Sequence, residues 1–190
     1  ETGISLSDLS GGLLAVVITY ANGCTLTETF DIIQNPPLII DSLISQDVSC
    51  FGAQDGVARV VTSGGTGVIS YAWSDNSTNP NNFGLSGGTY AVTISDTEDC
   101  TIQDSVVINE PDSLFIEIQR QEDARCQLTN GLISIEAVGG TSTYEYMWDT
   151  DPPTDQTTLT NLSGGTYTVT VVDANDCQVE SIISIDSLAS

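Results

Sequence analysis

The chain repeats itself with one long and nearly constant period, and this period constrains its fold more than any other feature. The motif Leu-Ser-Gly-Gly begins at three positions: Leu9, Leu85 and Leu162. A cysteine follows at the same distance from the start of each copy: Cys24, Cys100 and Cys177. The offsets are therefore 76 (85 − 9) and 77 (162 − 85). A fixed long period is typical of arrays in which one small unit stacks on copies of itself.

Two further motifs recur in the same order. Cys50-Phe-Gly-Ala-Gln-Asp-Gly56 recurs, at an offset of 76 (126 − 50), as Cys126-Gln-Leu-Thr-Asn-Gly131. Residues 64–73, which begin Gly-Gly-Thr and end Tyr-Ala-Trp, match residues 139–148, which begin Gly-Gly-Thr and end Tyr-Met-Trp. Several independent landmarks in one order exclude a chance similarity.

Proline interrupts the pattern at Asn35-Pro-Pro37 and at Glu110-Pro-Asp-Ser113. These interruptions predict a truncated repeat and two complete ones: residues 1–36, 37–112 and 113–190. The chain begins in the middle of a repeat and shows no signal peptide, so we expect it to be a fragment of a longer protein. Proline restricts the backbone and the linkers are short, so the units should lie nearly in line, as in a rod.

Each unit is predicted to be an immunoglobulin-like β-sandwich, which makes the fold class all-β with sandwiches arranged end to end. Residues 57–62 and 133–138 are strand-like runs bounded by Asp-Gly or Asn-Gly and Gly-Gly. Residues 89–96 and 166–173 alternate with period two and lead through a turn into residues 101–108 and 178–185. The inward-facing residues are expected to be Trp73, Tyr90, Val92 and Ile94, with Trp148, Tyr167, Val169 and Val171 as their counterparts.

The charge balance limits the partners. The chain has 26 acidic and 3 basic residues and a net charge of −23. Such a surface repels phosphates and anionic lipids, which argues against nucleic acid and membrane surfaces as partners. The longest apolar stretch, residues 13–18, is far too short to span a bilayer, so no direct membrane insertion is expected. Because 39% of residues are hydrophobic and only 15% are charged, the chain is not a disordered acidic tail.

An enzyme is hard to build from these residues. The chain contains no histidine and no lysine, which excludes Ser-His and Cys-His pairs and lysine Schiff bases. Asp149 and Asp151 could act as a glycosidase pair. However, the middle unit has Ser74-Asp75-Asn76 at this place, so the pair is not repeated. We predict no catalytic residues and no enzymatic activity.

The cysteines predict disulfides. Each complete unit holds two, Cys50 with Cys100 and Cys126 with Cys177, at nearly equal spacing. The regular pairing favours the bridges Cys50–Cys100 and Cys126–Cys177, with the partner of Cys24 upstream of the chain. Two alternatives stay open. In a regular immunoglobulin topology the first turn and the last hairpin lie at opposite ends, which would bring Cys50 towards Cys177 across the joint. The third alternative is free thiols.

Acidic turns are candidate calcium sites, although no other cofactor is expected. The candidate ligands are Asp96, Asp99, Asp173 and Asp176, because closely spaced carboxylates near a domain joint can supply the oxygens that calcium needs. The alternative is an ordinary hairpin turn, for which Asp and Asn are preferred. The absence of an Asp-x-Asp-x-Asp-Gly spacing favours the turn.

The motifs together resemble SprB-type repeats, which occur in very large surface adhesins of gliding Bacteroidota. The resemblance rests on Cys-x-Gly-x-x-Asp-Gly, on Gly-Gly-Thr-Gly with Tyr-x-Trp, on Leu-Ser-Gly-Gly-Thr-Tyr and on Asn-Glu-Pro. The third unit departs from it at Cys126-Gln-Leu, which lacks the glycine, and the first at Leu13-Leu14, where Thr-Tyr is expected. These departures are drift within an array and leave the predicted fold unchanged.

The resemblance implies export by type IX secretion, an outer-membrane-associated place on the cell surface, and a role in gliding motility and attachment. The expected partners are neighbouring repeats, extracellular polysaccharide and other cell-surface proteins. Four serines resemble the Asp-Ser-aliphatic motif for O-glycosylation in these bacteria: Ser42, Ser105, Ser113 and Ser187. We therefore expect a structural stalk segment of an adhesin. The alternative is a module that binds carbohydrate or protein through the loops around Asp75 or Asp149.

Overall fold

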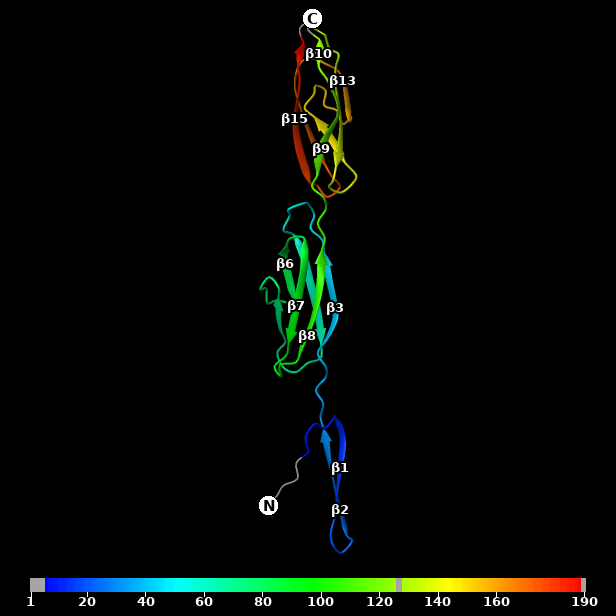
Figure 1. Cartoon of the computed structure of the whole chain (residues 1–190), viewed down its shortest axis with the longest axis vertical. Coiled ribbons are helices and arrows are strands. Elements are labelled where there is room, and N and C mark those ends of the chain that lie inside the picture. Colours follow the sequence, from blue (N-terminus) through cyan, green and yellow to red (C-terminus); the bar gives the residue numbers. More distant parts are fainter. Residues whose placement is uncertain (1–5, 126–127, 189–190) are drawn as a thin grey trace.

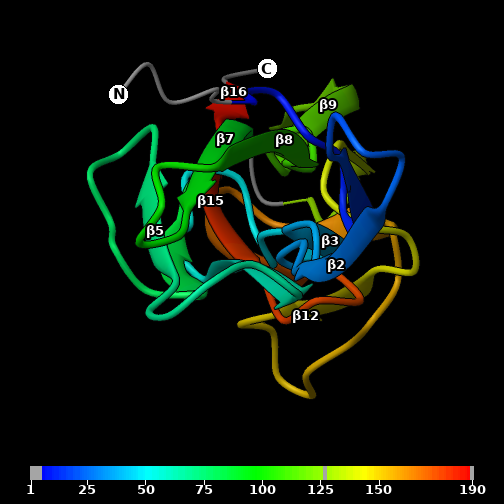
Figure 2. The same ribbon diagram turned by 90° about the horizontal axis from the view of Figure 1, so that it is seen from below.

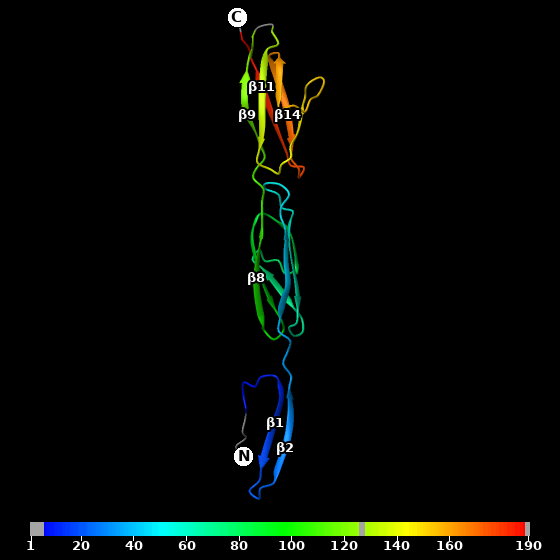
Figure 3. The same ribbon diagram turned by 90° about the vertical axis from the view of Figure 1, so that its right-hand side faces the viewer.

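The computed structural model describes residues 6–125 and 128–188. Every helix or strand in this described part is a β-strand, so the predicted all-β class is confirmed. Three bodies follow one another along one axis (Figure 1), and a view turned by 90° shows the same line (Figure 3). Seen along that axis, the three bodies overlap (Figure 2). None of the described residues form a helix long and apolar enough to cross a bilayer.

The first body is a single hairpin. Strand β1 (Gly12–Thr19) pairs antiparallel with β2 (Thr25–Ile32) along the whole length of both strands. The two strands form a two-stranded sheet of their own.

The middle body is a sandwich of two three-stranded sheets. One sheet has the order β3-β4-β6, with β3 (Ile39–Gln46), β4 (Gly56–Ser63) and β6 (Asn81–Leu85). The other has the order β5-β7-β8, with β5 (Ser70–Trp73), β7 (Gly88–Ser95) and β8 (Thr101–Ile108). All pairs within the two sheets are antiparallel. Strands β3 and β8 are therefore edge strands of their sheets.

The third body repeats this arrangement strand by strand. Its sheets have the orders β13-β11-β9 and β12-β14-β15. The strands are β9 (Phe115–Glu122), β11 (Gly131–Val138), β12 (Glu145–Trp148), β13 (Thr158–Leu162), β14 (Gly165–Val172) and β15 (Gln178–Ile185). Two short strands, β10 (Ala124–Arg125) and β16 (Ser187–Leu188), pair in parallel at its far end. The hairpin register is also the same, since Gly88 lies opposite Ile108 and Gly165 opposite Ile185.

A tryptophan fills the centre of each sandwich, as the sequence predicts. Trp73 and Trp148 are buried, and each indole N–H donates to a backbone carbonyl, that of Asn79 or of Gln156, over 2.8 Å. The hydrogen bonds satisfy the polar atom that burial would otherwise leave without a partner. Around the indoles pack the alternating residues of the predicted strands: Val92, Ile94, Val169 and Val171.

Two tyrosines add a second immunoglobulin-like feature. Tyr90 and Tyr167 are half-buried near the starts of β7 and β14. Each hydroxyl donates back to the carbonyl oxygen of a residue shortly before it, that of Ser86 at 3.1 Å and that of Ser163 at 2.9 Å. A tyrosine bonded backwards at the start of this strand, together with a buried tryptophan on the third strand, is characteristic of immunoglobulin-like sandwiches.

Truncation of the central indole should cost much of a sandwich's stability. Trp73 is 4% exposed, so Trp73→Ala should lower the free energy of unfolding by about 3–5 kcal/mol because it leaves a large cavity. Phe83→Ala in the same unit is the matched control, since Phe83 is 69% exposed and should cost far less. Urea denaturation followed by circular dichroism measures both changes. Equal losses would contradict the assigned core.

Candidate functional site

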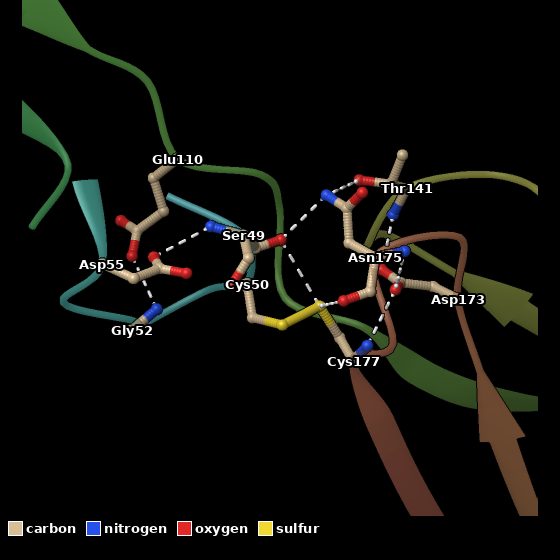
Figure 4. Close-up of a disulfide and its surroundings, with 9 residues drawn as sticks. All are labelled: Ser49, Cys50, Gly52, Asp55, Glu110, Thr141, Asp173, Asn175 and Cys177. Carbon is tan, nitrogen blue, oxygen red and sulfur yellow. Dashed lines mark hydrogen bonds between the residues drawn. A yellow bond between two sulfur atoms is a disulfide. The ribbon is translucent and has the colours of Figure 1, made fainter. Parts of the chain in front are cut away.

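The joint between the middle and third bodies carries the densest set of contacts that hold one body to another. It consists of the loop after β3 (residues 47–55), the linker (residues 109–113) and the turn between β14 and β15 (residues 173–177). Figure 4 shows these segments meeting around one disulfide. We call this set of residues the joint.

The start of the linker is fixed to the middle body. Asn109 donates to the Asp47 carboxylate through its backbone N–H at 2.8 Å, and its side-chain amide donates to both carboxylate oxygens. The Val48 N–H donates to the Asn109 carbonyl at 3.2 Å. One residue further, the Glu110 carboxylate accepts the Gly52 N–H at 2.6 Å. The linker therefore leaves the middle body in one direction instead of as a free tether.

The end of the linker is fixed to the third body by close backbone contact. Gly140 N–H donates to the Asp112 carbonyl at 2.8 Å. Gly139 has a φ of +77°, and a Cβ at this position would lie 2.1 Å from the Ser113 carbonyl oxygen. Only glycine permits both the conformation and the approach. The two glycines of the recurring Gly-Gly-Thr motif, Gly139 and Gly140, are thus needed for the linker to lie against the third body.

The turn that faces the middle body is organised by one carboxylate. Asp173 accepts the backbone N–H groups of Thr141, Asn175 and Cys177 at 2.8 to 2.9 Å. Burial acts to raise the pKa of Asp173, but these three donors outweigh it and hold the pKa below its ordinary value. The middle body has the same turn, in which Asp96 accepts from Thr66, Glu98 and Cys100.

A disulfide closes the joint. Cys50, in the loop after β3, is bonded to Cys177, which ends the turn of the next body, and their Cα atoms are 5.8 Å apart. Beside the bridge, the Asn175 side-chain amide donates to the Ser49 carbonyl oxygen at 2.9 Å. The bridge spans a sequence separation of 127 residues. On the chain-entropy model, closing a loop of this length raises the free energy of the unfolded chain by an amount on the order of 5 kcal/mol.

The favoured pairing within units, Cys50–Cys100 and Cys126–Cys177, is therefore wrong, and the alternative across the joint is the one found. Cys50 and Cys100 lie at opposite ends of the same sandwich, because Cys100 precedes β8 and Cys50 lies by the linker that follows β8. A strand of this length spans about 26 Å, far more than a disulfide can bridge. Cys177 is already bonded to Cys50, which excludes a bond to Cys126. Cys126 itself lies outside the described residues.

Cys24 and Cys100 are exposed and carry free thiols. The nearby Asp96 carboxylate, with smaller contributions from burial and from Glu98 and Asp99, raises the pKa of the Cys100 thiol above its ordinary value. Cys100 therefore holds its proton more tightly than a cysteine without such neighbours.

The four candidate calcium ligands lie on the two equivalent turns. Asp96 and Asp173 direct their carboxylates towards backbone N–H donors, while Asp99 and Asp176 are exposed and have left-handed backbone angles. Among the described residues, no group of three His, Cys, Asp or Glu side chains could hold a metal ion. Calcium binding at these turns stays a prediction.

The remaining candidate residues are spread over the surface. Ser42 is half-buried on β3, and Ser105, Ser113 and Ser187 are exposed, so O-glycosylation also stays a prediction. The loop carboxylates of the binding-module alternative are engaged within their own units: Asp75 accepts from Ser77 and Asn82, and Asp149 accepts from Thr168. Asp151 is exposed.

Two hollows adjoin the joint. One, of about 280 Å³, is lined by residues that include Asp47, Glu110 and Asn175. The other, of about 420 Å³, is lined by both bridged cysteines and by the exposed ring of Phe51. Neither hollow was predicted from the sequence, because the favoured pairing of the cysteines within units does not bring their walls together.

Residues 42–78, within the middle body, match the family model of the SprB repeat. No curated protein matches the sequence.

Several solved structures are similar in outline. The three N-terminal domains of the outer capsid protein Hoc of bacteriophage RB49 share 18% identity and a TM-score of 0.47, over 78% of this chain and 58% of that one. A C-terminal fragment of intimin, solved with the intimin-binding domain of its translocated receptor, shares 13% and 0.45, over 80% and 65%. The N-terminal eight immunoglobulin domains of DSCAM share 10% and 0.47, over 87% and 26%. The chain spans less than two thirds of each.

The disulfide connectivity can be tested by peptide mapping. Digestion of the unreduced chain should yield the Cys50 peptide bonded to the Cys177 peptide, because these two sulfurs are joined across the joint. Cys177→Ser should leave Cys50 open to alkylation, whereas Cys100→Ser should not. Mass spectrometry reads both results. A peptide pair that joins Cys50 to Cys100 would refute the joint described above.

The turn should make stability depend on pH in a defined direction. The pKa of Asp173 is lowered in the folded chain, so its stabilising effect is present above the ordinary Asp pKa and is lost as the pH falls through the lower, folded value. Asp173→Asn should flatten the fall in unfolding free energy on acidification. Asp176→Asn, at an exposed position of the same turn, is the matched control. Identical acid profiles for both variants would contradict this role of Asp173.

Proposed function

We propose that the chain is a tension-carrying stalk segment of a large secreted cell-surface adhesin used in surface attachment and gliding. The SprB repeat in the middle body supports an adhesin-like, extracellular and structural module. The observation that carries the proposal is the disulfide between successive sandwiches, because a bond at that place serves a chain that is pulled from its ends.

The bridge changes the path along which force travels. Tension that enters at the N-terminus reaches Cys50 through β3, crosses to Cys177, and leaves along β15. Residues 51–176 lie inside the closed loop and are not stretched. Within the two sandwiches, only β3, β15 and the short β16 lie outside the closed loop and can be peeled away under load, and the N-terminal hairpin of β1 and β2 lies outside it as well. Most of both sandwiches is thereby protected from extension.

The bridge also restricts bending. The linker holds the two bodies at one point, and the disulfide with the Asn175–Ser49 hydrogen bond holds them at another. Two attachments resist rotation in the plane that contains them, whereas a single short linker would leave a hinge. A stiff joint transmits displacement along the shaft, which a surface adhesin needs in order to hold a substratum at a distance.

A binding module for carbohydrate or protein is the second candidate. Its support is the exposed ring of Phe51 at the larger hollow beside the bridge, since aromatic rings commonly stack on ligands. The carboxylates around which this alternative was first framed are used internally, which weakens it. Type IX export and outer-membrane association complete the proposal and rest on the family resemblance.

Small-angle scattering on arrays of increasing length tests the stalk. For arrays built from residues 37–190, the maximum dimension should grow in proportion to the number of units, because each bridged pair is stiff. Arrays with Cys50→Ser and Cys177→Ser are the control, and they should have a smaller maximum dimension than bridged arrays with the same number of units. Growth close to the square root of unit number in the bridged arrays would show flexible joints and exclude the stalk.

A further inference from the structure

The N-terminal hairpin is the last hairpin of a repeat. Its residues match β7 and β8 with an offset of 76 (88 − 12), and its register matches as well, since Gly12 lies opposite Ile32 as Gly88 lies opposite Ile108. Cys24 lies in its turn at the place that Cys100 occupies in the middle body. The hairpin thus corresponds to two of the three strands of one sheet of a sandwich.

One face of this hairpin is bare where its equivalents are buried. Leu9 is 42% exposed, whereas its equivalent Leu85 is 3% exposed. Ile18 on β1 is 46% exposed, whereas its equivalent Ile94 on β7 is fully buried. A sheet face with several large apolar side chains open to water is unusual and indicates a binding surface.

The same structure shows twice what covers such a face. In the middle body the face of β7 and β8 packs against the sheet β3-β4-β6, and in the third body the face of β14 and β15 packs against β9-β11-β13. The shape and apolar pattern of the bare face therefore fit the first half of a repeat of this same type.

Cys100 lies at the end of the middle body that adjoins the hairpin. The linker residue Pro36 accepts the Gly65 N–H at 3.1 Å, and the neighbouring Thr66 N–H donates to Asp96, which heads the Cys100 turn. Cys100 is the repeat equivalent of Cys177, whose turn is organised by the same pattern of three hydrogen bonds. Cys177 is bonded to the first-loop cysteine of the preceding repeat, Cys50. The position that would supply the same partner to Cys100 lies one full period before Cys50 and so outside the sequence.

We propose that the hairpin face and Cys100 form one docking site, which takes the first half of a SprB-type repeat and bonds that half's first-loop cysteine to Cys100. The apolar face of the hairpin binds the first sheet of that repeat. The bound sheet then places the loop after its first strand beside the Cys100 turn. The cross-joint disulfide is then a property of each successive joint and not of one pair of sandwiches.

The bond forms by exchange with a low-molecular-weight disulfide such as oxidised glutathione. The first-loop thiolate attacks one sulfur of this oxidant, forms a mixed disulfide and releases one small thiol. Cys100 then loses its proton to water and its thiolate attacks the protein sulfur of the mixed disulfide, releasing the second small thiol. The two protein thiols lose two electrons and two protons, which the oxidant gains.

An extended chain tests the proposal. A copy of residues 37–84 is placed directly before Leu9, which keeps the period of the array, and the protein is equilibrated in a buffer of reduced and oxidised glutathione. Cys100 should become resistant to alkylation until a reductant is added. Mass spectrometry of the unreduced digest should show a Cys50-type peptide bonded to the Cys100 peptide, beside the Cys50–Cys177 pair. Backbone amides of β1 and β2 should exchange hydrogen as slowly as those of β7 and β8.

Two variants separate folding from bonding. The extended chain with serine for the copied cysteine should keep the slow exchange of β1 and β2 but leave Cys100 open to alkylation. The extended chain with Ile18→Asp should lose both, because the docked sheet no longer covers an apolar face. The proposal is overturned if Cys100 stays open to alkylation while the Cys50–Cys177 bond forms normally, or if the copied cysteine pairs with Cys24. Neither result depends on whether the protein is a stalk.

Discussion

The bond between Cys50 and Cys177 is the contact on which the remaining features of the joint depend. It joins the first loop of one sandwich to the last turn of the next. The two sandwiches are therefore connected at two places, by the linker and by the disulfide. The hydrogen bonds to Asp173 fix the turn that contains Cys177, and the contacts of Asp47 and Glu110 hold the loop that contains Cys50 beside the linker. Each of these interactions is individually modest. Together they place two sulfurs within bonding distance, and the covalent bond then makes the arrangement permanent in an oxidising environment.

Such a bond suits the electrostatics of this chain. With a net charge of −23 and a single described ion pair, between Arg120 and Glu122, charge attraction does little to hold neighbouring bodies together. Repulsion between acidic surfaces favours an extended array and opposes close docking, the more so at low salt. A covalent bridge and a linker fixed by backbone hydrogen bonds keep the bodies in line without a large apolar interface. Inside each sandwich, stability comes from the core around the tryptophan, which consists of uncharged side chains.

The strands with clear alternation could be predicted from the sequence. The pairing of the cysteines was not decided by it, because the sequence favoured bonds within each unit and left the bond between Cys50 and Cys177 across the joint as an open alternative. β4, β7, β8, β11, β14 and β15 fall within a residue or two of the expected runs, because their inward residues are apolar and their ends are marked by turn residues. The first strands, β3 and β9, were not assigned. They are edge strands with mostly exposed residues, and so they carry little periodic signal. Equal spacing of cysteines within each unit favoured bonds inside the unit. Spacing along a chain does not report which end of a sandwich a residue occupies. The sandwich topology places Cys50 and Cys100 at opposite ends of one unit and Cys50 beside Cys177 of the next.

Single-molecule stretching between the two termini tests the central claim most directly. With the bridge intact, only the segments outside the closed loop, residues 1–50 and 177–190, can extend, and they make up about a third of the chain. At ~3.6 Å per residue this limits the fully unfolded chain to about 230 Å, whereas a chain reduced before stretching should reach about 680 Å. An oxidised chain that extends to the longer length would show that no bond joins the two sandwiches, and the account of a protected, stiff shaft would be wrong.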